Sequence, residues 1–251
     1  MCTLGKSLAH GLAHRHGREG IQQLQARARH VSASRVNKPG KQSRQAAFKR
    51  LRKDIRGVYG TDCILFAVES GQKKDALSIY YCVEPHEDGG HTVFVVAISA
   101  RTPQPQVLPL LHFNRHATAG LLQATTTEQP IAALRRLNAL FACLAHFDHA
   151  DDACEHVVLV EPDVGWMPTR FNRNKGVAEV KTVISAAALS PWRKALLLGC
   201  ATEQRRILVD TRPNSEIRND IGNNPKTLAF WPTAEYWVAT HHGEPPASAS
   251  R

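Results

Sequence analysis

Residues 62–99 read DCILFAVESGQKKDALSIYYCVEPHEDGGHTVFVVAIS and contain three short segments rich in Val, Ile, Phe and Tyr. Such residues favour β-strands, so we predict strands at 62–69, 76–84 and 91–99. The stretches between them are rich in Gly, Pro, Asp and Lys, a composition typical of turns. Short turns join neighbouring antiparallel strands, so the three segments are expected to form a meander.

Helical spacing of apolar residues follows this region. After a loop with three prolines, the pattern predicts helices at 115–123 and 131–147. Further strands or extended segments are expected at 156–160, 165–171, 177–185 and 206–210, with another helix from Pro191 to about Gly199. This order predicts an α+β domain in which helices pack on a largely antiparallel sheet, rather than a doubly wound parallel sheet.

Positive charge is concentrated at the N-terminal end of the chain. Residues 1–57 contain 14 of the 32 Lys and Arg residues but only two of the 22 acidic residues, Glu19 and Asp54. The formal net charge of +10 therefore comes from this end. Because concentrated positive charge attracts polyanions, we expect nucleic acid to be a partner.

Residues 1–42 contain several glycines and no sustained periodicity, which predicts a flexible basic arm that could contain a short helix at Ile21–Val31. Organellar targeting peptides share this Arg-rich, acid-poor composition, so both interpretations stay open. From residue 43, Phe48, Leu51 and Ile55 recur at helical spacing and predict an amphipathic helix. Its basic face either contacts phosphate or is simply solvated; the basic residues are Arg44, Lys49, Arg50, Arg52, Lys53 and Arg56.

The expected organisation is the arm at 1–42, one α+β domain at 43–240 and a disordered tail at 241–251. Apolar runs are far shorter than the roughly 20 residues of a membrane-spanning helix. The first residues lack the continuous apolar stretch of a secretory signal. Six cysteines without a C-x-x-C pair indicate reduced thiols. We therefore expect a cytoplasmic protein with no membrane partner.

The most suggestive chemistry surrounds the start of the helix predicted at 115–123. If that helix begins near Asn114, its first turn holds His116 beside unpaired backbone N–H groups that favour anions. Two imidazoles can act as general base and general acid, while cations stabilise a phosphate. These are the requirements of metal-independent RNA cleavage through the 2′-hydroxyl. The candidate catalytic residues are His112, His116, Arg115, Lys181 and Thr182. The two histidines could equally be ordinary helix-start and surface residues.

The same region resembles the barnase, colicin and RelE-type ribonuclease toxin superfamily over residues of about 110–200. His116-Ala117 resembles the opening of that family's helix, Gln123 falls near its glutamine, and Lys181-Thr182 resembles the end of its late strand. The resemblance implies an endoribonuclease with an antitoxin or immunity protein as partner. Gly120 and Ala124 stand where the family has basic residues, so a degenerate, binding-only descendant is the alternative that the resemblance leaves open.

A second cluster of imidazoles and carboxylates lies further along the chain. His146, His149 and Asp151 could bind Zn²⁺ or Mn²⁺ if the predicted helix persists that far. The same residues are also typical of a helix end followed by a turn. The chain has no phosphate-binding loop of the Walker or dinucleotide type, and no cofactor is expected.

Three functions are therefore open from the sequence. The first is a nucleic-acid-associated protein that cleaves RNA without metal, with RNA preferred over DNA because the reaction uses the 2′-hydroxyl. The second is a non-catalytic regulatory module that binds nucleic acid or an acidic protein through the basic N-terminal residues. The third is a metal-dependent hydrolase centred on His146 and His149.

Overall fold

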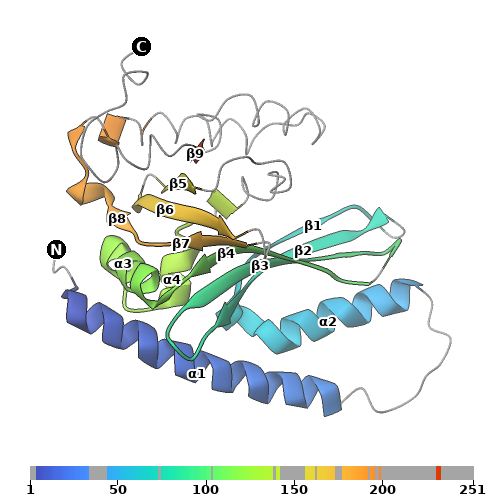
Figure 1. The fold of residues 1–251 in the computed structure, drawn as a ribbon. Helices are drawn as coiled ribbons and strands as arrows, with labels where there is room; N and C mark the ends of the chain where they lie inside the picture. The colour runs from blue at the N-terminus through green and yellow to red at the C-terminus, as the bar shows by residue number, and fades with distance from the viewer. Residues whose placement is uncertain are drawn as a thin grey trace.

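The computed structural model describes residues 4–33, 44–72, 75–102, 104–137, 140–141, 156–161, 163–172, 177–191, 193–195, 198 and 230–232. These residues form helices packed on a curled sheet (Figure 1). In the described residues the sheet has nine strands, and eight of them follow the order β1-β2-β3-β4-β7-β6-β5-β9, while β8 pairs with β6. Every neighbouring pair is antiparallel except β4 and β7, which are parallel. The predicted α+β class with a largely antiparallel sheet is confirmed.

The predicted meander forms the first half of the sheet. β1 (Ile64–Ser70), β2 (Leu77–Pro85) and β3 (His91–Ser99) are antiparallel neighbours, and β4 (Gln106–Phe113) extends them. The second half contains β5 (His156–Glu161), β6 (Gly165–Asn172), β7 (Val177–Val180), β8 (Ile184–Ser185) and β9 (Phe230–Pro232).

The two inner strands of the meander, β2 and β3, bury both of their faces. Val83 and Val93 are partners across β2 and β3 and belong to the large core that also contains residues of the helices after β4. Their neighbours Cys82 and Phe94 point to the opposite face, because successive side chains in a strand alternate, and belong to a second, smaller core. These strands therefore read as nearly continuous apolar runs.

The smaller core is closed by α2 (Arg44–Cys63), the basic amphipathic helix that the sequence predicts. Phe48 and Ile55 are buried against the sheet, and Leu51 is partly buried beside them. The Tyr59 ring meets Phe94 edge to face, with centroids 5.4 Å apart. Apolar spacing thus predicts both the helix and its buried face.

The N-terminal segment differs from its prediction. Residues expected to form a flexible arm form a 28-residue helix, α1 (Lys6–Ala33), whose Ala9, Leu12 and Ala13 are buried in the large core. Two of the glycines that suggested flexibility, Gly17 and Gly20, permit close packing instead. A Cβ at Gly17 would lie 2.3 Å from the His86 carbonyl oxygen, so only glycine allows α1 to cross the β2–β3 turn this closely.

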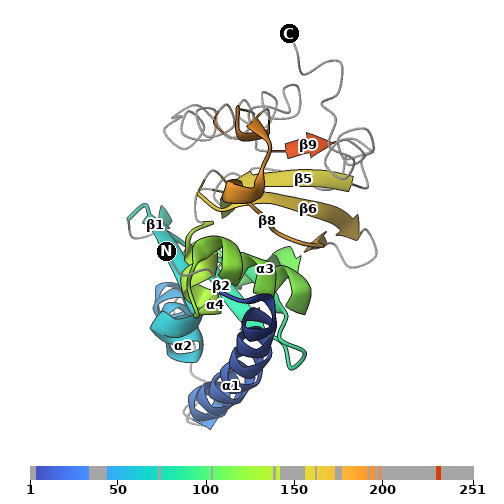
Figure 2. The ribbon, with the colours of Figure 1, turned by 90° about the vertical axis from the view of Figure 1, so that its left-hand side faces the viewer.

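The two helices after β4 occupy the centre of the molecule. α3 (Arg115–Thr125) confirms the predicted helix, and α4 (Pro130–Arg135) forms the beginning of the next one. Figures 1 and 2 both show α3 between α1 and the strands of the second half of the sheet. Its small residues suit this enclosed position, since Ala117, Thr118 and Ala119 are all buried.

The strand predicted at 177–185 is interrupted. β7 ends at Val180, and the Lys181 N–H makes one more bond to β6 at the Pro168 carbonyl oxygen. The chain then pairs with β6 again as β8, before a short 3-10 helix at Ala186–Ala188. The reason is packing against α3, because a Cβ at Gly120 would lie 3.3 Å from the Val183 backbone. The strand expected at 206–210, residues 138–139 and 142–147 of the helix expected at 131–147, and the tail at 241–251 lie outside the described residues.

Candidate nucleic-acid site

The candidate site begins where β4 passes into α3. Asn114 caps the helix, with its Oδ1 accepting a hydrogen bond of 2.8 Å from the Ala117 backbone N–H. Arg115 and His116 then form the exposed first turn. The helix start predicted near Asn114 is therefore found, and the backbone N–H groups of this turn give it a positive partial charge.

The residues that follow β7 lie beside the first turn of α3. Because β7 runs parallel to β4, both strands end at the same edge of the sheet, next to the start of α3. Thr182 follows β7, and its Oγ1 lies 3.3 Å from the Nε2 of His116. The structure thus brings together two of the candidate catalytic residues.

A third residue at this position comes from α1. The His10 ring stacks on His116, with centroids 5.4 Å apart and an angle of 27° between the planes. Burial lowers the pKa of His10 below its usual value. Neighbouring positive charges lower it further; they belong to His116, Arg115 and Lys6. His10 is therefore a neutral imidazole in a positive environment at pH 7.

Arg115 immediately precedes His116 in the sequence, and Lys181 immediately precedes Thr182. Arg115 is exposed at the first position of α3. Lys181 bonds to Glu179, with 2.9 Å between Nζ and Oε2, and its side chain is 39% exposed. Part of the Lys181 charge is consequently balanced inside the protein before any ligand arrives.

His112 belongs to a second group on the adjoining strands. Its Nδ1 lies 2.9 Å from Thr92 Oγ1, which lies 2.8 Å from His86 Nε2. A hydroxyl has one hydrogen to donate, so at least one of these two ring nitrogens must itself carry a proton for both bonds to form. The rings of His86 and His112 also meet edge to face, with centroids 5.2 Å apart.

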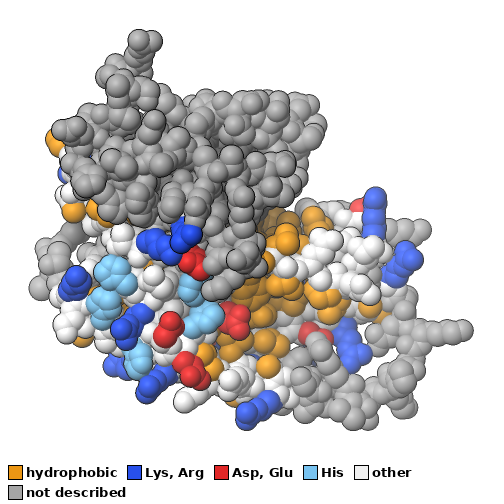
Figure 3. All heavy atoms as spheres, viewed as in Figure 1, with side chains coloured by type: hydrophobic (Ala, Val, Ile, Leu, Met, Phe, Trp, Pro, Cys, Tyr) orange, Lys and Arg blue, Asp and Glu red, His pale blue; other side chains and the backbone are white. Residues whose placement is uncertain are grey.

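The two groups meet at the edge where β4 and β7 end. His112 is the ladder partner of Glu179 on β7, and Glu179 bonds to Lys181, the residue before Thr182. Figure 3 shows histidine side chains gathered with acidic and basic ones on one half of the molecular surface in view, beside an apolar area. The five candidate catalytic residues therefore lie around one strand edge, although His112 and His116 have different bonded neighbours.

The basic face of α2 is partly used within the protein. Arg52 and Arg56 both bond to Glu69 of β1. Three other cations on this helix, Arg44, Lys49 and Lys53, are exposed. On α1 a further set of cations is exposed, namely Lys6, Arg15, Arg18 and Arg29. The surface available to a polyanion thus extends over both helices.

The metal cluster proposed from the sequence cannot be placed, because His146, His149 and Asp151 lie outside the described residues. Within the described part, no group of three or more His, Cys, Asp and Glu side chains could hold a metal ion. The described helices also include none that is long and apolar enough to cross a membrane.

Comparison with known proteins gives no further guidance to the site. No family model, no curated protein and no solved structure matches this chain. The resemblance to ribonuclease toxins stays a prediction from the residues that carry it.

Sequence reasoning missed His10, the residue that stacks on His116. The signal that could have found it is the repeat of small and apolar residues at Ala9, Leu12 and Ala13, which has helical spacing. Glycines interrupt that repeat and led to the prediction of an arm. With α1 recognised as a packed helix, His10 would have become a candidate from an unrelated part of the sequence.

Proposed function

We propose that this protein binds RNA and cleaves it without a metal ion at the start of α3. The observation that carries the proposal is the contact between His116 and Thr182, with His10 stacked on the same imidazole. Two imidazoles, a hydroxyl and exposed cations beside a helix N-terminus provide acid, base and phosphate-binding groups in one place.

The reaction needs one group to accept a proton and another to donate one. A neutral imidazole removes the proton of the ribose 2′-hydroxyl, and the 2′-oxygen then attacks the adjacent phosphorus. The bond from phosphorus to the 5′-oxygen breaks, and that oxygen takes a proton from the second imidazole. The products are a 2′,3′-cyclic phosphate and a 5′-hydroxyl, so atoms and charges balance without a cofactor.

The depressed pKa of His10 suits it to the role of base, because its imidazole is neutral at pH 7. His116 then serves as the acid, with Thr182 fixing the orientation of its ring. His112 is the alternative second imidazole, as the sequence suggests. Arg115 and Lys181 lie where they can balance the charge that develops on the phosphate, and Thr182 can also donate a hydrogen bond to it.

The cations of α1 and α2 supply the affinity in this proposal. Their exposed Lys and Arg side chains form a surface that contacts RNA phosphates, and such contacts bring an RNA strand to α3. Binding of this kind weakens steeply as salt rises, because it depends on the release of counterions. A gel-shift series across salt concentration measures this part of the proposal directly.

The reaction is tested with an end-labelled RNA incubated with the protein in EDTA. Cleavage that leaves a 2′,3′-cyclic phosphate supports the proposal. A DNA strand that carries one ribonucleotide should be cut only after that ribonucleotide, because only there is a 2′-hydroxyl present. Cleavage of the all-DNA control, or cleavage that EDTA abolishes, would contradict a metal-independent reaction through the 2′-hydroxyl.

A second function, RNA binding without cleavage, is favoured by the bond between Lys181 and Glu179. A lysine that is balanced by a carboxylate gives less stabilisation to a phosphate. Replacing Glu179 by Gln distinguishes the two functions. An enzyme should then cleave faster because the charge of Lys181 is no longer balanced by a carboxylate, whereas a binding module should gain affinity in the gel shift and still not cleave.

A further inference from the structure

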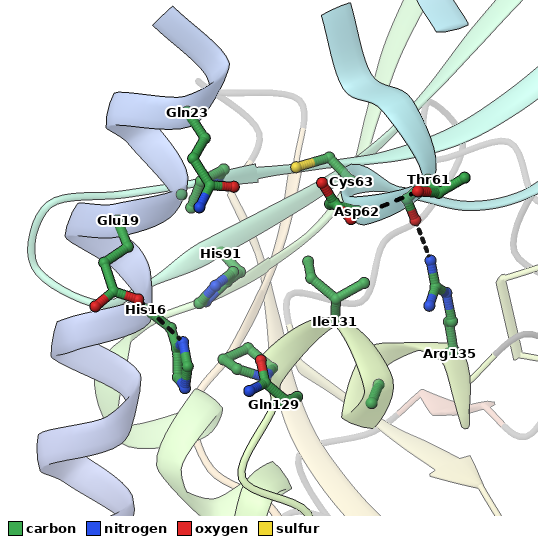
Figure 4. A pocket seen from close by; sticks show the side chains of 14 residues that line it. His16, Glu19, Gln23, Thr61, Asp62, Cys63, His91, Gln129, Ile131 and Arg135 are labelled. Atoms are coloured by element: carbon green, nitrogen blue, oxygen red, sulfur yellow. Dashed lines mark hydrogen bonds and ion pairs between the residues drawn. The ribbon is translucent and has the colours of Figure 1, made fainter. Parts of the chain in front are cut away.

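A cavity of about 510 Å³ lies on a different side of α1 from the stacked histidines. It is a partly open pocket lined by residues of α1, the end of α2, the start of α4, the end of β2 and the start of β3 (Figure 4). This volume is in the range of sites that bind small molecules. Its lining contains both polar and apolar side chains.

The charged side chains on the α2 side of the cavity already make hydrogen bonds within the protein. The Arg135 guanidinium donates hydrogen bonds to the carbonyl oxygens of Thr61 and Ile64, at the end of α2. Asp62 bonds to Arg27 of α1. These charges stabilise the junction of three helices, so they offer little to a ligand.

The α1 side has polar groups with unused capacity. His16 Nδ1 lies 3.7 Å from Glu19 Oε2. His16 Nε2 is buried with no hydrogen-bond partner in the described part of the chain. A buried ring nitrogen without a partner is costly unless a ligand reaches it.

Charge on this side is negative in an otherwise positive helix. Glu19 is the only acidic residue within Lys6–Ala33, and it lies at the cavity between the cations of that helix. Gln23 and Gln129 line the same side and can present amide oxygens. Figure 4 shows Gln23 and His16 extending from α1 toward the cavity and Gln129 approaching from the start of α4.

The buried imidazole of His91 does not offset the negative charge that Glu19 brings to the cavity. His91 is 2% exposed, and burial, with His86 and His16 nearby, lowers its pKa to about 3. It is therefore neutral at pH 7 and does not repel a cation. Pro85, Pro130 and Ile131 supply apolar surface between the polar groups.

We propose that this cavity binds a small organic cation, an ammonium or guanidinium group on a short apolar stem. Its N–H groups donate to the Glu19 carboxylate, to His16 Nε2 and to the Gln129 amide oxygen. The stem lies against Pro85, Pro130 and Ile131. The site is separate from the proposed RNA-cleaving residues, so neither proposal depends on the other.

Calorimetric titration of the full chain tests the site with n-butylammonium and agmatine as cationic probes and n-butanol as the neutral isostere. We expect the cations to bind and n-butanol to show no heat of binding at the same concentrations. Glu19→Gln should weaken cation binding by about tenfold, the loss of one charge-assisted hydrogen bond. Glu87→Gln, which removes an exposed carboxylate outside the cavity, should leave the affinity unchanged.

A second variant guards against loss of structure in Glu19→Gln. Gln23→Glu adds a carboxylate at the same wall and should tighten binding of both cations. The proposal would be overturned if n-butanol bound as well as the cations, or if neither cation bound at up to about 10 mM. It would also be overturned if the Kd of the cations were the same in Glu19→Gln, or if adenosine bound in place of the cations. A Kd of about 10 mM corresponds to a binding free energy of only about 3 kcal/mol, which is the weakest binding that the proposal allows.

Discussion

The imidazole of His10 stacks on that of His116, although one lies on the first helix and the other begins the third. This contact joins the N-terminal helix to the strand edge where the candidate residues meet. It also helps to lower the pKa of His10, because a positive charge on His116 disfavours a second one on the neighbouring ring.

His116→Ala should raise the pKa of His10. The substitution removes a positive neighbour and leaves the other charges in place, so the protonated form of His10 becomes less unfavourable. The change is measured by NMR titration of the His10 ring protons. His14→Ala, one turn further along α1, is the control and should leave the His10 titration where it is. A His10 pKa that does not move in His116→Ala would contradict the observed stacking.

Gly17→Ala should destabilise the protein by about 1–3 kcal/mol through overpacking. The added Cβ would lie 2.3 Å from the His86 carbonyl oxygen and 2.8 Å from Gly89 Cα, both of which are backbone atoms. Gly11→Ala on the same helix is the matched control, since a Cβ there has nothing within 4 Å. It should stabilise α1 by about 0.5–1 kcal/mol. Urea unfolding measures both changes, and equal effects would mean that α1 does not cross the β2–β3 turn as described.

Glu161 should make the protein less stable as pH rises from about 4.5 to about 7. Burial raises the pKa of this carboxyl to about 7, and Asp163 raises it as well, so the folded protein holds a proton that the unfolded chain releases. The shift corresponds to about 3 kcal/mol. Glu161→Gln keeps an acceptor for the Leu140 N–H and should be more stable than the parent at pH 8 but not at pH 4. Thermal unfolding at both pH values tests this, and parallel profiles would argue against a buried carboxyl.

His91 should make the protein less stable as pH falls, which is the opposite pH dependence to that of Glu161. Its pKa is lowered to about 3, chiefly by burial, so the unfolded chain takes up a proton below about pH 6.5 that the folded protein refuses. Stability that His91 contributes is therefore complete above pH 6.5 and decreases as pH falls toward 3. His91→Gln should flatten the acid limb of the stability profile measured by urea unfolding. An acid limb unchanged by the substitution would assign the loss to other groups.

The sheet was predictable where local sequence decides the structure. Residues 62–99 alternate β-forming segments with turn residues, and the meander follows from that pattern. The prediction of one unbroken strand at 177–185 was wrong, because the interruption of that strand depends on a distant contact, the packing of Val183 on Gly120. No local pattern encodes that contact.

The candidate site shows the same division. Helical spacing and the Asn114 cap predict the start of α3, and the sequence predicts that His116 and Thr182 belong to one site, where the structure places them in contact. The stacking of His10 was not predictable from the glycine-rich segment read alone, because α1 is held in place by tertiary packing. The bond between Lys181 and Glu179 is likewise a product of the strand edge rather than of charge pattern.

Cleavage of RNA by His116→Ala tests the central claim most directly. The variant should bind RNA in a gel shift as the parent does, and its single-turnover cleavage in EDTA should fall by about 100-fold or more, the usual contribution of general acid–base catalysis. His14→Ala, prepared in the same way, should cleave at the parent rate. Cleavage by His116→Ala at the rate of His14→Ala would contradict the account and leave only RNA binding by the basic helices.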